Sequence, residues 1–355
     1  MVRRRSRSRK KKSGCLPGLL LLTLLVVGAA ACALAWLLLG SYGPATETFV
    51  EIAPGSSTAQ IATQLEGAGV LRSRYGLEMV RWARRGKKGS LKAGEYRFDH
   101  PSTPLEIYTR LVRGDVFTVS VTIPEGATIF DVGGQLEHAG LVRRAEFVEF
   151  ALGQTALVAD LDPSASSLEG YLFPDTYRFA RKATAAQIAT IMVKRFRTVL
   201  ATQLGVKPSP ATLRVHRLVT LASLVERETA VEADRPLVAS VLSNRLKRNM
   251  PLMTDAAVVY GLERGGTWRG RIFASDLKRD TRYNTYLHTG LPPGPIANPG
   301  LKALRAALSP PETNYLYFVA AGKNAQGASR FSATLDEHNE AVAEYRRAVR
   351  QGGGH

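Results

Sequence analysis

The sequence predicts an α+β protein that follows one N-terminal transmembrane helix, and three observations lead to this class. Residues 16–39 are uncharged and rich in Leu, Val and Ala. After them, a strand, a tight Pro/Gly turn and an amphipathic helix are predicted twice in the same order. Residues 166–349 then alternate helical stretches with Gly, Pro, Tyr and Asn clusters and contain one clear strand. Separate strands among helices are typical of α+β proteins.

The 355 residues are enough for two or three domains with a substantial core. We divide them into consecutive segments: a basic tail (1–15), a transmembrane helix (16–39), a linker (40–48), a first α+β module (49–117), a second module (118–165), a large α+β domain (166–349) and a frayed tail (350–355).

Composition narrows the class of partner. The formal charge is +18, and the first twelve residues alone hold eight Lys and Arg and no acid. The remainder is still basic, which suits an anionic polymer or an anionic membrane surface. We expect no nucleic acid, because no zinc-finger spacing and no aromatic-basic RNA-binding pattern occurs. Cys15 and Cys32 are the only cysteines and the histidines are scattered, so we expect no disulfide in the large part and no structural zinc site.

Residues 16–39 are long enough to span a bilayer with some tilt. The positive-inside rule keeps the basic tail cytoplasmic and places the large part outside the cytoplasm. A cleaved signal peptide is one alternative, but its apolar region is usually shorter. A lipoprotein cleavage site before Cys32 is another, but Ala29 stands where leucine is expected. We therefore expect a retained single-pass anchor.

An internal duplication follows the linker. Gly55 and Gly126, Leu65 and Leu136, and Gly69 and Gly140 each lie 71 residues apart. A fixed offset across several identities indicates a repeated unit. Each copy is predicted to form a short strand, a tight turn and an amphipathic helix that ends at glycine. Residues 94–98 form a further candidate strand, and residues 105–111 a short helix.

One predicted helix in the large domain carries the best candidate for chemistry. Ser209 suits the N-cap and Pro210 the first helical position. Apolar residues then recur at helical spacing through Val215, Leu218, Leu221, Ala222 and Val225. Glu226 and Glu228 fall inside this apolar arc, whereas Arg227 points to water. Burial raises the pKa of a carboxyl, which suits a general acid, but both glutamates could instead pair with arginines.

Other elements of the large domain frame this helix. Residues 184–204 are predicted to form a basic amphipathic helix that serves as a solvated wall. Residues 290–300 are too rich in Pro and Gly for a helix or central strand, so they form a stiff loop suited to lining a groove. Further elements are helices at 237–246, 256–262 and 301–308, a strand at 315–320 paired with 331–334, and a final helix to about residue 349.

Two resemblances give these elements a function. Residues 121–132 resemble the opening of a LysM module, a binder of N-acetylated glycan chains; a spacer without glycan affinity is the equal alternative. A series of short motifs, taken together and in their order along the chain, resembles the endolytic murein transglycosylases. These are single-pass inner-membrane enzymes with a LysM-like region before the catalytic domain. The motifs are Glu169-Gly170, Phe173-Pro174-Asp175-Thr176, Ala222-Ser223, Val225-Glu226-Arg227-Glu228-Thr229, Asn244-Arg245-Leu246, Thr254-Asp255, Tyr260-Gly261, Tyr283-Asn284-Thr285-Tyr286, Gly290-Leu291-Pro292-Pro293-Gly294, Tyr315-Leu316-Tyr317-Phe318-Val319-Ala320 and His338-Asn339.

The family resemblance implies that residues 118–165 are a LysM-like module and residues 166–349 the transglycosylase domain. It makes Glu228, the glutamate followed by Thr, the catalytic acid, and Glu226 a supporting carboxylate or an ion-pair partner. Asn244, Thr254, Asp255, Tyr283 and Asn284 are candidates for sugar and acetamido contacts; each could equally hold a loop in place. Met253, Ala256 and the stretch around Ser329-Arg330 depart from the family pattern at the edges of the groove.

The implied reaction cleaves the β-1,4 bond between N-acetylmuramic acid and N-acetylglucosamine within nascent peptidoglycan strands and leaves 1,6-anhydro-muramic acid ends, which limits strand elongation. It needs no metal and no organic cofactor. Because the substrate's own C6 hydroxyl attacks, one carboxyl can serve in turn as acid and base. The resemblance also implies penicillin-binding synthases and divisome proteins as partners. Two alternatives remain: a membrane-anchored, non-catalytic glycan-binding scaffold, and a hydrolase that leaves reducing ends.

Overall fold

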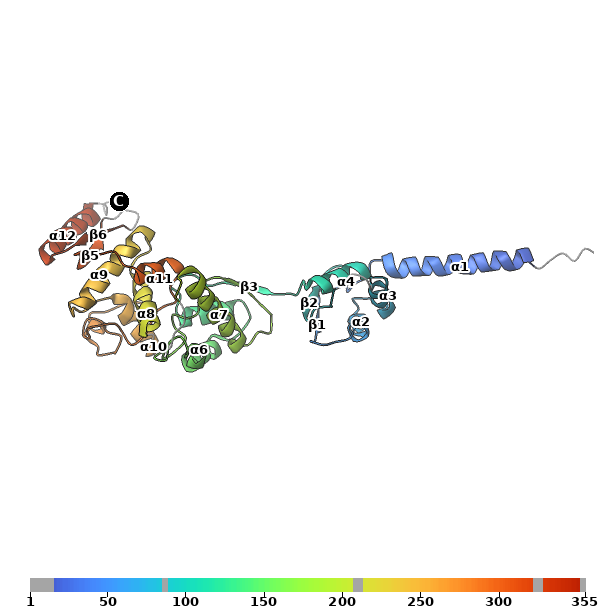
Figure 1. The fold of residues 1–355 in the computed structure, drawn as a ribbon, viewed down its shortest axis with the longest axis horizontal. Helices are drawn as coiled ribbons and strands as arrows, with labels where there is room; N and C mark the ends of the chain where they lie inside the picture. The colour runs from blue at the N-terminus through green and yellow to red at the C-terminus, as the bar shows by residue number, and fades with distance from the viewer. Residues whose placement is uncertain (1–15, 85–88, 207–212, 322–327, 352–355) are drawn as a thin grey trace, which may run out of the picture. The chain divides into compact units, whose positions relative to one another are not determined.

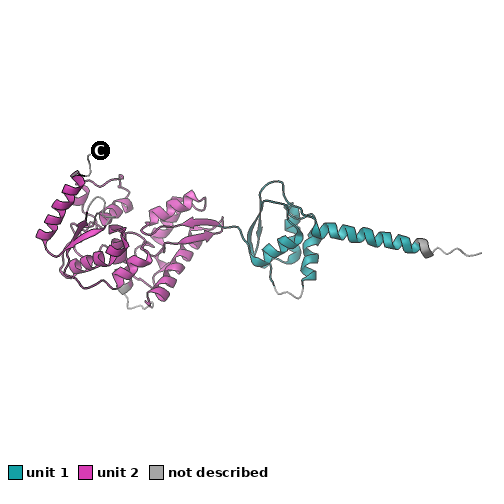
Figure 2. Ribbon diagram, turned by 90° about the horizontal axis from the view of Figure 1, so that it is seen from above, with its two compact units in different colours: residues 1–118 teal, residues 119–355 magenta. Residues whose placement is uncertain are grey.

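The computed structural model describes residues 16–84, 89–206, 213–321 and 328–351. The chain forms two compact units, residues 1–118 (unit 1) and 119–355 (unit 2) (Figure 2). The predicted basic tail, the predicted cap and first position at Ser209 and Pro210, and residues 352–355 of the predicted frayed tail lie outside the described residues.

Unit 1 begins with the helix α1 (Leu16–Leu39), which has no charged residue along its length (Figure 1). Its length and composition allow it to cross a membrane. Two strands and three short helices follow: β1 (Thr48–Ile52), α2 (Thr58–Gly67), α3 (Arg74–Ala83), β2 (Gly94–Phe98) and α4 (Pro104–Arg113). β1 pairs antiparallel with β2, with Thr48 opposite Phe98. Capping boxes at Ser57 and Thr103 fix where α2 and α4 begin.

Unit 2 opens with the same order of elements. The strands β3 (Val119–Thr122) and β4 (Thr176–Phe179) pair antiparallel, with Val119 opposite Phe179. Between them lie α5 (Ile129–His138), α6 (Arg144–Gly153) and a short 3₁₀ turn (Thr155–Leu157). In both units, therefore, a strand is followed by two helices and a strand that returns to pair with the first.

The rest of unit 2 is mostly helical. Its elements are α7 (Ala185–Gln203), α8 (Leu213–Glu228), α9 (Arg235–Lys247), α10 (Asp255–Arg264), α11 (Leu301–Leu308), α12 (Leu335–Gln351), the strands β5 (Tyr317–Ala320) and β6 (Ser329–Ser332), and 3₁₀ turns at Glu232–Asp234 and Asp276–Lys278. β5 pairs antiparallel with β6 as a hairpin. Figure 1 shows α8 in the middle of unit 2, and α8 packs against α9, α10 and α11.

Some predicted elements need correction. The helix at 184–204 is not a solvated wall: α7 buries Ile188, Met192 and Phe196 in the core of unit 2. The helices α3 and α6 were not predicted. The final helix extends to Gln351, two residues past the predicted end.

A buried asparagine joins three loops around α8. The Asn298 side chain is fully buried; its amide donates to the Ala127 carbonyl (2.8 Å) and to Glu169 Oε1 (3.0 Å). Its carbonyl oxygen accepts from the Gly170 and Leu172 amides at 2.9 and 3.0 Å. Because every polar atom of this side chain has a partner, Asn298 fixes the 124–127 turn, the 169–172 loop and the Pro/Gly-rich loop to one another.

Gly170 permits the close packing at this junction. Its φ of +87° lies in the left-handed region, and an added Cβ would stand 2.6 Å from Pro295 and 2.7 Å from Val219 of α8. The Pro/Gly-rich loop also contacts α8 directly, since the Ile296 amide donates to Ser223 Oγ (3.0 Å). The loop is thus held against the helix that carries Glu226 and Glu228.

Candidate active site

Glu228 is the last residue of α8. The apolar positions that precede it are buried, Arg227 is exposed, and Glu228 is half-buried, as the helical spacing predicts. The pKa of Glu228 is raised to about 7, chiefly by burial and also by the charge of Asp255, while Arg245 and Arg227 act in the opposite direction. Among the described residues, none donates a hydrogen bond to this carboxyl. Glu228 therefore offers a carboxylic acid that is partly protonated near neutral pH.

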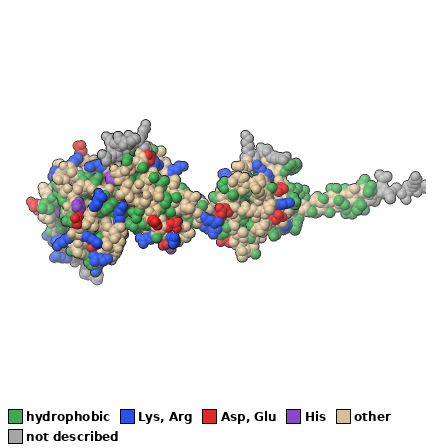
Figure 3. Space-filling view, turned by 90° about the horizontal axis from the view of Figure 1, so that it is seen from below, with side chains coloured by type: hydrophobic (Ala, Val, Ile, Leu, Met, Phe, Trp, Pro, Cys, Tyr) green, Lys and Arg blue, Asp and Glu red, His purple; other side chains and the backbone are tan. Residues whose placement is uncertain are grey.

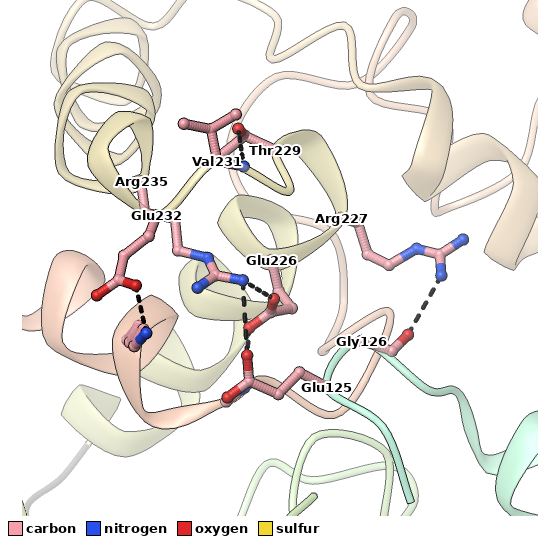
Figure 4. Close-up of polar contacts among 10 residues, drawn as sticks. Glu125, Gly126, Glu226, Arg227, Thr229, Val231, Glu232 and Arg235 are labelled. Carbon is pink, nitrogen blue, oxygen red and sulfur yellow. Dashed lines mark hydrogen bonds and ion pairs between the residues drawn. The ribbon is translucent and has the colours of Figure 1, made fainter. Parts of the chain in front are cut away.

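Glu226, two residues earlier, lies in a different environment. Its side chain is only 4% exposed and forms an ion pair with Arg235 of α9 (Nη2 to Oε1, 2.6 Å). Its other oxygen accepts from the Gly300 amide at the start of α11 (2.9 Å) (Figure 4). Burial raises the pKa of Glu226, but the Gly300 amide and Arg235 oppose the shift. Both oxygens are thus engaged in joining α8 to α9 and α11, which fits the ion-pair alternative rather than a glycan contact.

A turn from the second module completes this junction. Glu125 lies 3.6 Å from the same Arg235 guanidinium, and Arg227 donates to the Gly126 carbonyl (3.2 Å) (Figure 4). An added Cβ at Gly300 would stand 1.9 Å from Glu125 Oε1, so a larger residue there would displace this carboxylate from its present position. The end of α8 is consequently held on several sides while Glu228 is left without a partner in the described structure.

A cavity of about 470 Å³ opens beside Glu228. This volume lies within the range of about 300–1,000 Å³ that is usual for small-ligand sites. One wall is the end of α8 and the residues after it, and the other is the β5–β6 hairpin; the lining residues are Glu228, Thr229, Ala230, Val231, Phe318, Val319, Ala320 and Ser329. Thr229 Oγ1 accepts from the Val231 amide (3.0 Å), which fixes the turn after the helix (Figure 4). Glu228 thus faces an accessible space.

Asp255 and two side chains that were not predicted, Arg245 and Tyr286, make up the electrostatic environment of Glu228. Asp255, the first residue of α10, is exposed and accepts a hydrogen bond from the Tyr286 hydroxyl (2.7 Å). Arg245 donates to the backbone carbonyls of Leu316 (2.7 Å) and Leu252 (3.0 Å), and its charge acts on Glu228. Burial lowers the pKa of Arg245. Asp255 and Arg245 therefore act on the pKa of the candidate acid in opposite directions.

The remaining predicted contacts lie in structural positions. Asn284 is 0% exposed, and its amide donates to the carbonyls of Leu277 (3.0 Å) and Arg279 (2.8 Å). Thr254 is buried, and its hydroxyl forms a hydrogen bond with the Thr285 hydroxyl (3.2 Å). The Asn244 amide donates to the carbonyls of Thr313 (2.8 Å) and Tyr315 (3.0 Å). These contacts favour the loop-holding alternative for Thr254 and Asn284 and give Asn244 a role in placing the chain before β5.

Tyr283 belongs to another cavity. It is 8% exposed, stacks edge-on against Tyr260 with ring centres 5.0 Å apart, and lines a cavity of about 270 Å³. The other lining residues are Ser164, Ser166, Arg264, Arg282 and Pro293. Glu228 is not among them, so Tyr283 and the candidate acid line different cavities of these two.

Sequence reasoning did not single out Arg245, Tyr286 or Phe318. The available signal was their position within or beside the motifs Asn244-Arg245-Leu246, Tyr283-Asn284-Thr285-Tyr286 and the strand at 315–320. In the described ranges, no group of three or more His, Cys, Asp or Glu side chains is placed to hold a metal ion. The chemistry that the described site can supply from its own side chains is proton transfer and electrostatic stabilisation.

The chain is similar to known proteins over most of its length. The sequence profile of the YceG-like family matches residues 50–344. The endolytic murein transglycosylase of Bacillus subtilis (strain 168) is 33% identical over 316 residues, which cover 84% of this chain and 85% of that protein. The endolytic murein transglycosylase of Streptococcus pneumoniae serotype 2 is 30% identical over 83% of this chain; the match spans 58% of the pneumococcal protein.

A solved structure gives the same relationship. The crystal structure of a yceG-like protein from Listeria monocytogenes is 32% identical in sequence and superimposes with a TM-score of 0.53 over 83% of this chain and 98% of that chain. The family profile covers well over half of the sequence, including both copies of the strand-helix-helix-strand arrangement and α8. The chain therefore belongs to the YceG-like family.

Proposed function

We propose that this chain is a membrane-anchored lytic transglycosylase that cleaves the β-1,4 bond between N-acetylmuramic acid and N-acetylglucosamine within peptidoglycan strands. The observation that carries the proposal is Glu228, a carboxyl with a pKa raised to about 7 that lines an accessible cavity at the end of a buried helix. The family and the relatives named endolytic murein transglycosylase give this acid its substrate class.

In the first step, protonated Glu228 donates its proton to the glycosidic oxygen as the bond from that oxygen to C1 of the muramic acid breaks. The leaving strand departs with a free 4-hydroxyl, and positive charge develops on C1 and the ring oxygen. The Glu228 carboxylate then takes the proton of the C6 hydroxyl, whose oxygen attacks C1 and closes the 1,6-anhydro ring. Glu228 ends protonated again, and no water is consumed.

Its surroundings suit Glu228 to both halves of this cycle. A pKa near the working pH lets the same group donate and then accept a proton. Asp255 helps to keep Glu228 protonated before reaction, and Arg245 helps to stabilise the carboxylate after the proton has left. Asp255 is exposed, and we propose it together with its hydrogen-bond partner Tyr286 as the groups nearest to direct sugar contact.

The membrane and partner assignments belong to the same proposal. We place α1 in the inner (plasma) membrane, with the basic tail cytoplasmic and both units outside the cytoplasm. Residues 48–98 and 119–179 share one element order, and we propose that they descend from one duplicated LysM-like unit. Action on nascent strands would place the protein beside penicillin-binding synthases and divisome proteins.

The test uses the full-length protein, solubilised in detergent, on purified sacculi. The proposal predicts new 1,6-anhydro ends from the wild type and none from Glu228→Gln. Glu232→Gln is the matched control, because Glu232 lies four residues away, is largely exposed and pairs with Lys302 on the surface. A wild type that binds sacculi without forming new ends would favour the non-catalytic scaffold, and new reducing ends would favour the hydrolase.

A further inference from the structure

The end of α1 is packed directly onto the rest of unit 1. The Arg72 guanidinium lies 3.5 Å from the centre of the Trp36 ring and 5.3 Å from that of Tyr42. Leu38 packs against the core of unit 1. Tyr42 and Ser102 exchange two backbone hydrogen bonds (3.1 and 2.9 Å). The residues after α1 are therefore pinned, and a bilayer that α1 spans would end close to the surface of unit 1.

The helix α3 lies at this same end. Figure 1 shows it at the side of unit 1 from which α1 leaves, running across the direction of α1. Contacts between α1 and α3 support this placement, and an added Cβ at Gly76 of α3 would lie 3.7 Å from the Leu37 carbonyl. If α1 crosses a membrane, α3 therefore runs along the membrane plane.

The exposed face of α3 is apolar, although the exposed face of a helix in water is normally polar. Tyr75, Met79 and Trp82 recur at spacings of four and three residues and are 54%, 37% and 66% exposed. They form one stripe, because residues at these spacings share a helix face. Leu77 and Val80 occupy the opposite face and are buried. A solvated helix rarely shows a contiguous aromatic stripe of this kind, which marks an interaction surface.

The side chains around the stripe fit one partner, the headgroup region of a phospholipid bilayer. Arg74 is exposed and stacks over the Tyr75 ring (5.0 Å). Arg81, on the same helix, points inward and donates to the Tyr108 hydroxyl (3.3 Å). Glu78 is the only acid in α3. Trp, Tyr and Arg together are typical of the membrane interface, where amphipathic rings sit at headgroup level and arginine meets anionic lipid. Figure 3 shows hydrophobic side chains along α1 and where it joins unit 1.

We propose that α3 is an interfacial helix, whose Tyr75, Met79 and Trp82 insert into the headgroup region of the membrane that α1 spans. Unit 1 is then held to the bilayer at two places, by α1 and by α3, and cannot rotate freely about the end of α1. The inference rests on the proposed membrane anchor and adds that unit 1 has a fixed orientation relative to the membrane.

The test measures the depth of Trp82 in full-length protein reconstituted into vesicles of phosphatidylethanolamine and phosphatidylglycerol. The chain has three tryptophans, so Trp36→Phe with Trp268→Phe leaves Trp82 as the only one. The proposal predicts a blue-shifted emission and a loss of fluorescence when the vesicles carry a lipid with a spin label near the headgroup. The control adds Trp82→Phe and Asp115→Trp; Asp115 is exposed and follows α4, where the chain leaves unit 1. Its fluorescence should be solvent-like and unquenched.

The outcomes separate this inference from the anchor on which it rests. Flotation of the same vesicles reports whether the protein is anchored at all. Protein that floats while Trp82 is solvent-like and unquenched overturns the interfacial helix but leaves the anchor intact. A blue-shifted Trp82 that the labelled lipid does not quench indicates a protein neighbour and also overturns the proposal. Protein that fails to float overturns the anchor itself.

Discussion

Replacing Glu228 by Gln should remove activity and at the same time stabilise the protein above neutral pH. Glutamine cannot donate the proton, so anhydro-end formation should stop. The same substitution removes a group whose ionised form the fold disfavours. Folding raises the pKa of Glu228 from the ordinary 4.5 to about 7, chiefly through burial. The same raised pKa that lets Glu228 act as an acid therefore lowers the stability of the wild type above neutral pH, and Glu228→Gln should restore that stability.

The size of this stability change, and the pH range in which it appears, follow from the linkage between proton binding and folding. Below about pH 4.5 the wild-type carboxyl is protonated in both the folded and the unfolded chain, so it contributes no difference. Between 4.5 and about 7 only the unfolded chain ionises, and the free energy of unfolding falls as pH rises. The full shift corresponds to about 3 kcal/mol, which partial exposure of the carboxyl reduces to about 1–3 kcal/mol.

The assay is thermal unfolding of wild type, Glu228→Gln and Glu232→Gln at pH 4 and pH 8. Glu228→Gln should unfold at a higher temperature than wild type at pH 8 and at the same temperature at pH 4. Glu232 is largely exposed, so its variant should match wild type at both. Equal or lower stability of Glu228→Gln at pH 8 would refute the argument that Glu228 is held in a poorly solvated site.

Four other outcomes are expected. The rate of anhydro-end formation should fall as pH rises through about 7, and Asp255→Asn should move this fall to lower pH, because the Asp255 charge raises the pKa of Glu228; an unchanged pH–rate profile would show that Asp255 does not act on the acid. Glu226→Ala should lower the free energy of unfolding by about 3 kcal/mol in a urea titration, since it leaves the buried Arg235 without its closest partner; a fully stable variant would contradict the structural role of this pair. Asn298→Ala should cost at least about 3 kcal/mol, because several buried groups lose their hydrogen bonds, whereas substitution of exposed Asn339 by Ala should cost little in the same titration. Gly170→Ala should destabilise by about 2–4 kcal/mol through left-handed strain and overlap with Pro295, and near-wild-type unfolding would show that the loop can move away from α8.

Local sequence patterns predicted the helix that carries the site but could not choose between its two glutamates. Helical spacing places Glu226 and Glu228 on the same apolar arc. What separates them is distant in sequence: Arg235 and the Gly300 amide engage Glu226, and Asp255 acts on Glu228. Such pairings depend on how α8, α9, α10 and α11 pack, which no single helix encodes.

The two missed helices have identifiable reasons. In α3, exposed Tyr75 and Trp82 lie opposite buried Leu77, so apolar residues occupy both faces and blur the periodic signal. In α6, Phe147 and Ala151 are the buried residues, and Arg143 makes no side-chain cap, so the sequence lacks both a stripe and a start signal. The substrate-contact candidates show the same limit, because Asn284 and Thr254 look alike as polar loop residues whether they face a groove or the interior.

The most direct test of the central claim is the source of the atom that attacks C1. Wild-type protein is incubated with glycan strands in water enriched in heavy oxygen, and the new muramic acid ends are weighed by mass spectrometry. If the C6 hydroxyl closes onto C1, the ends lack one water and carry no label. Ends that carry heavy oxygen at C1 would contradict the account, because water rather than the sugar would then be the nucleophile.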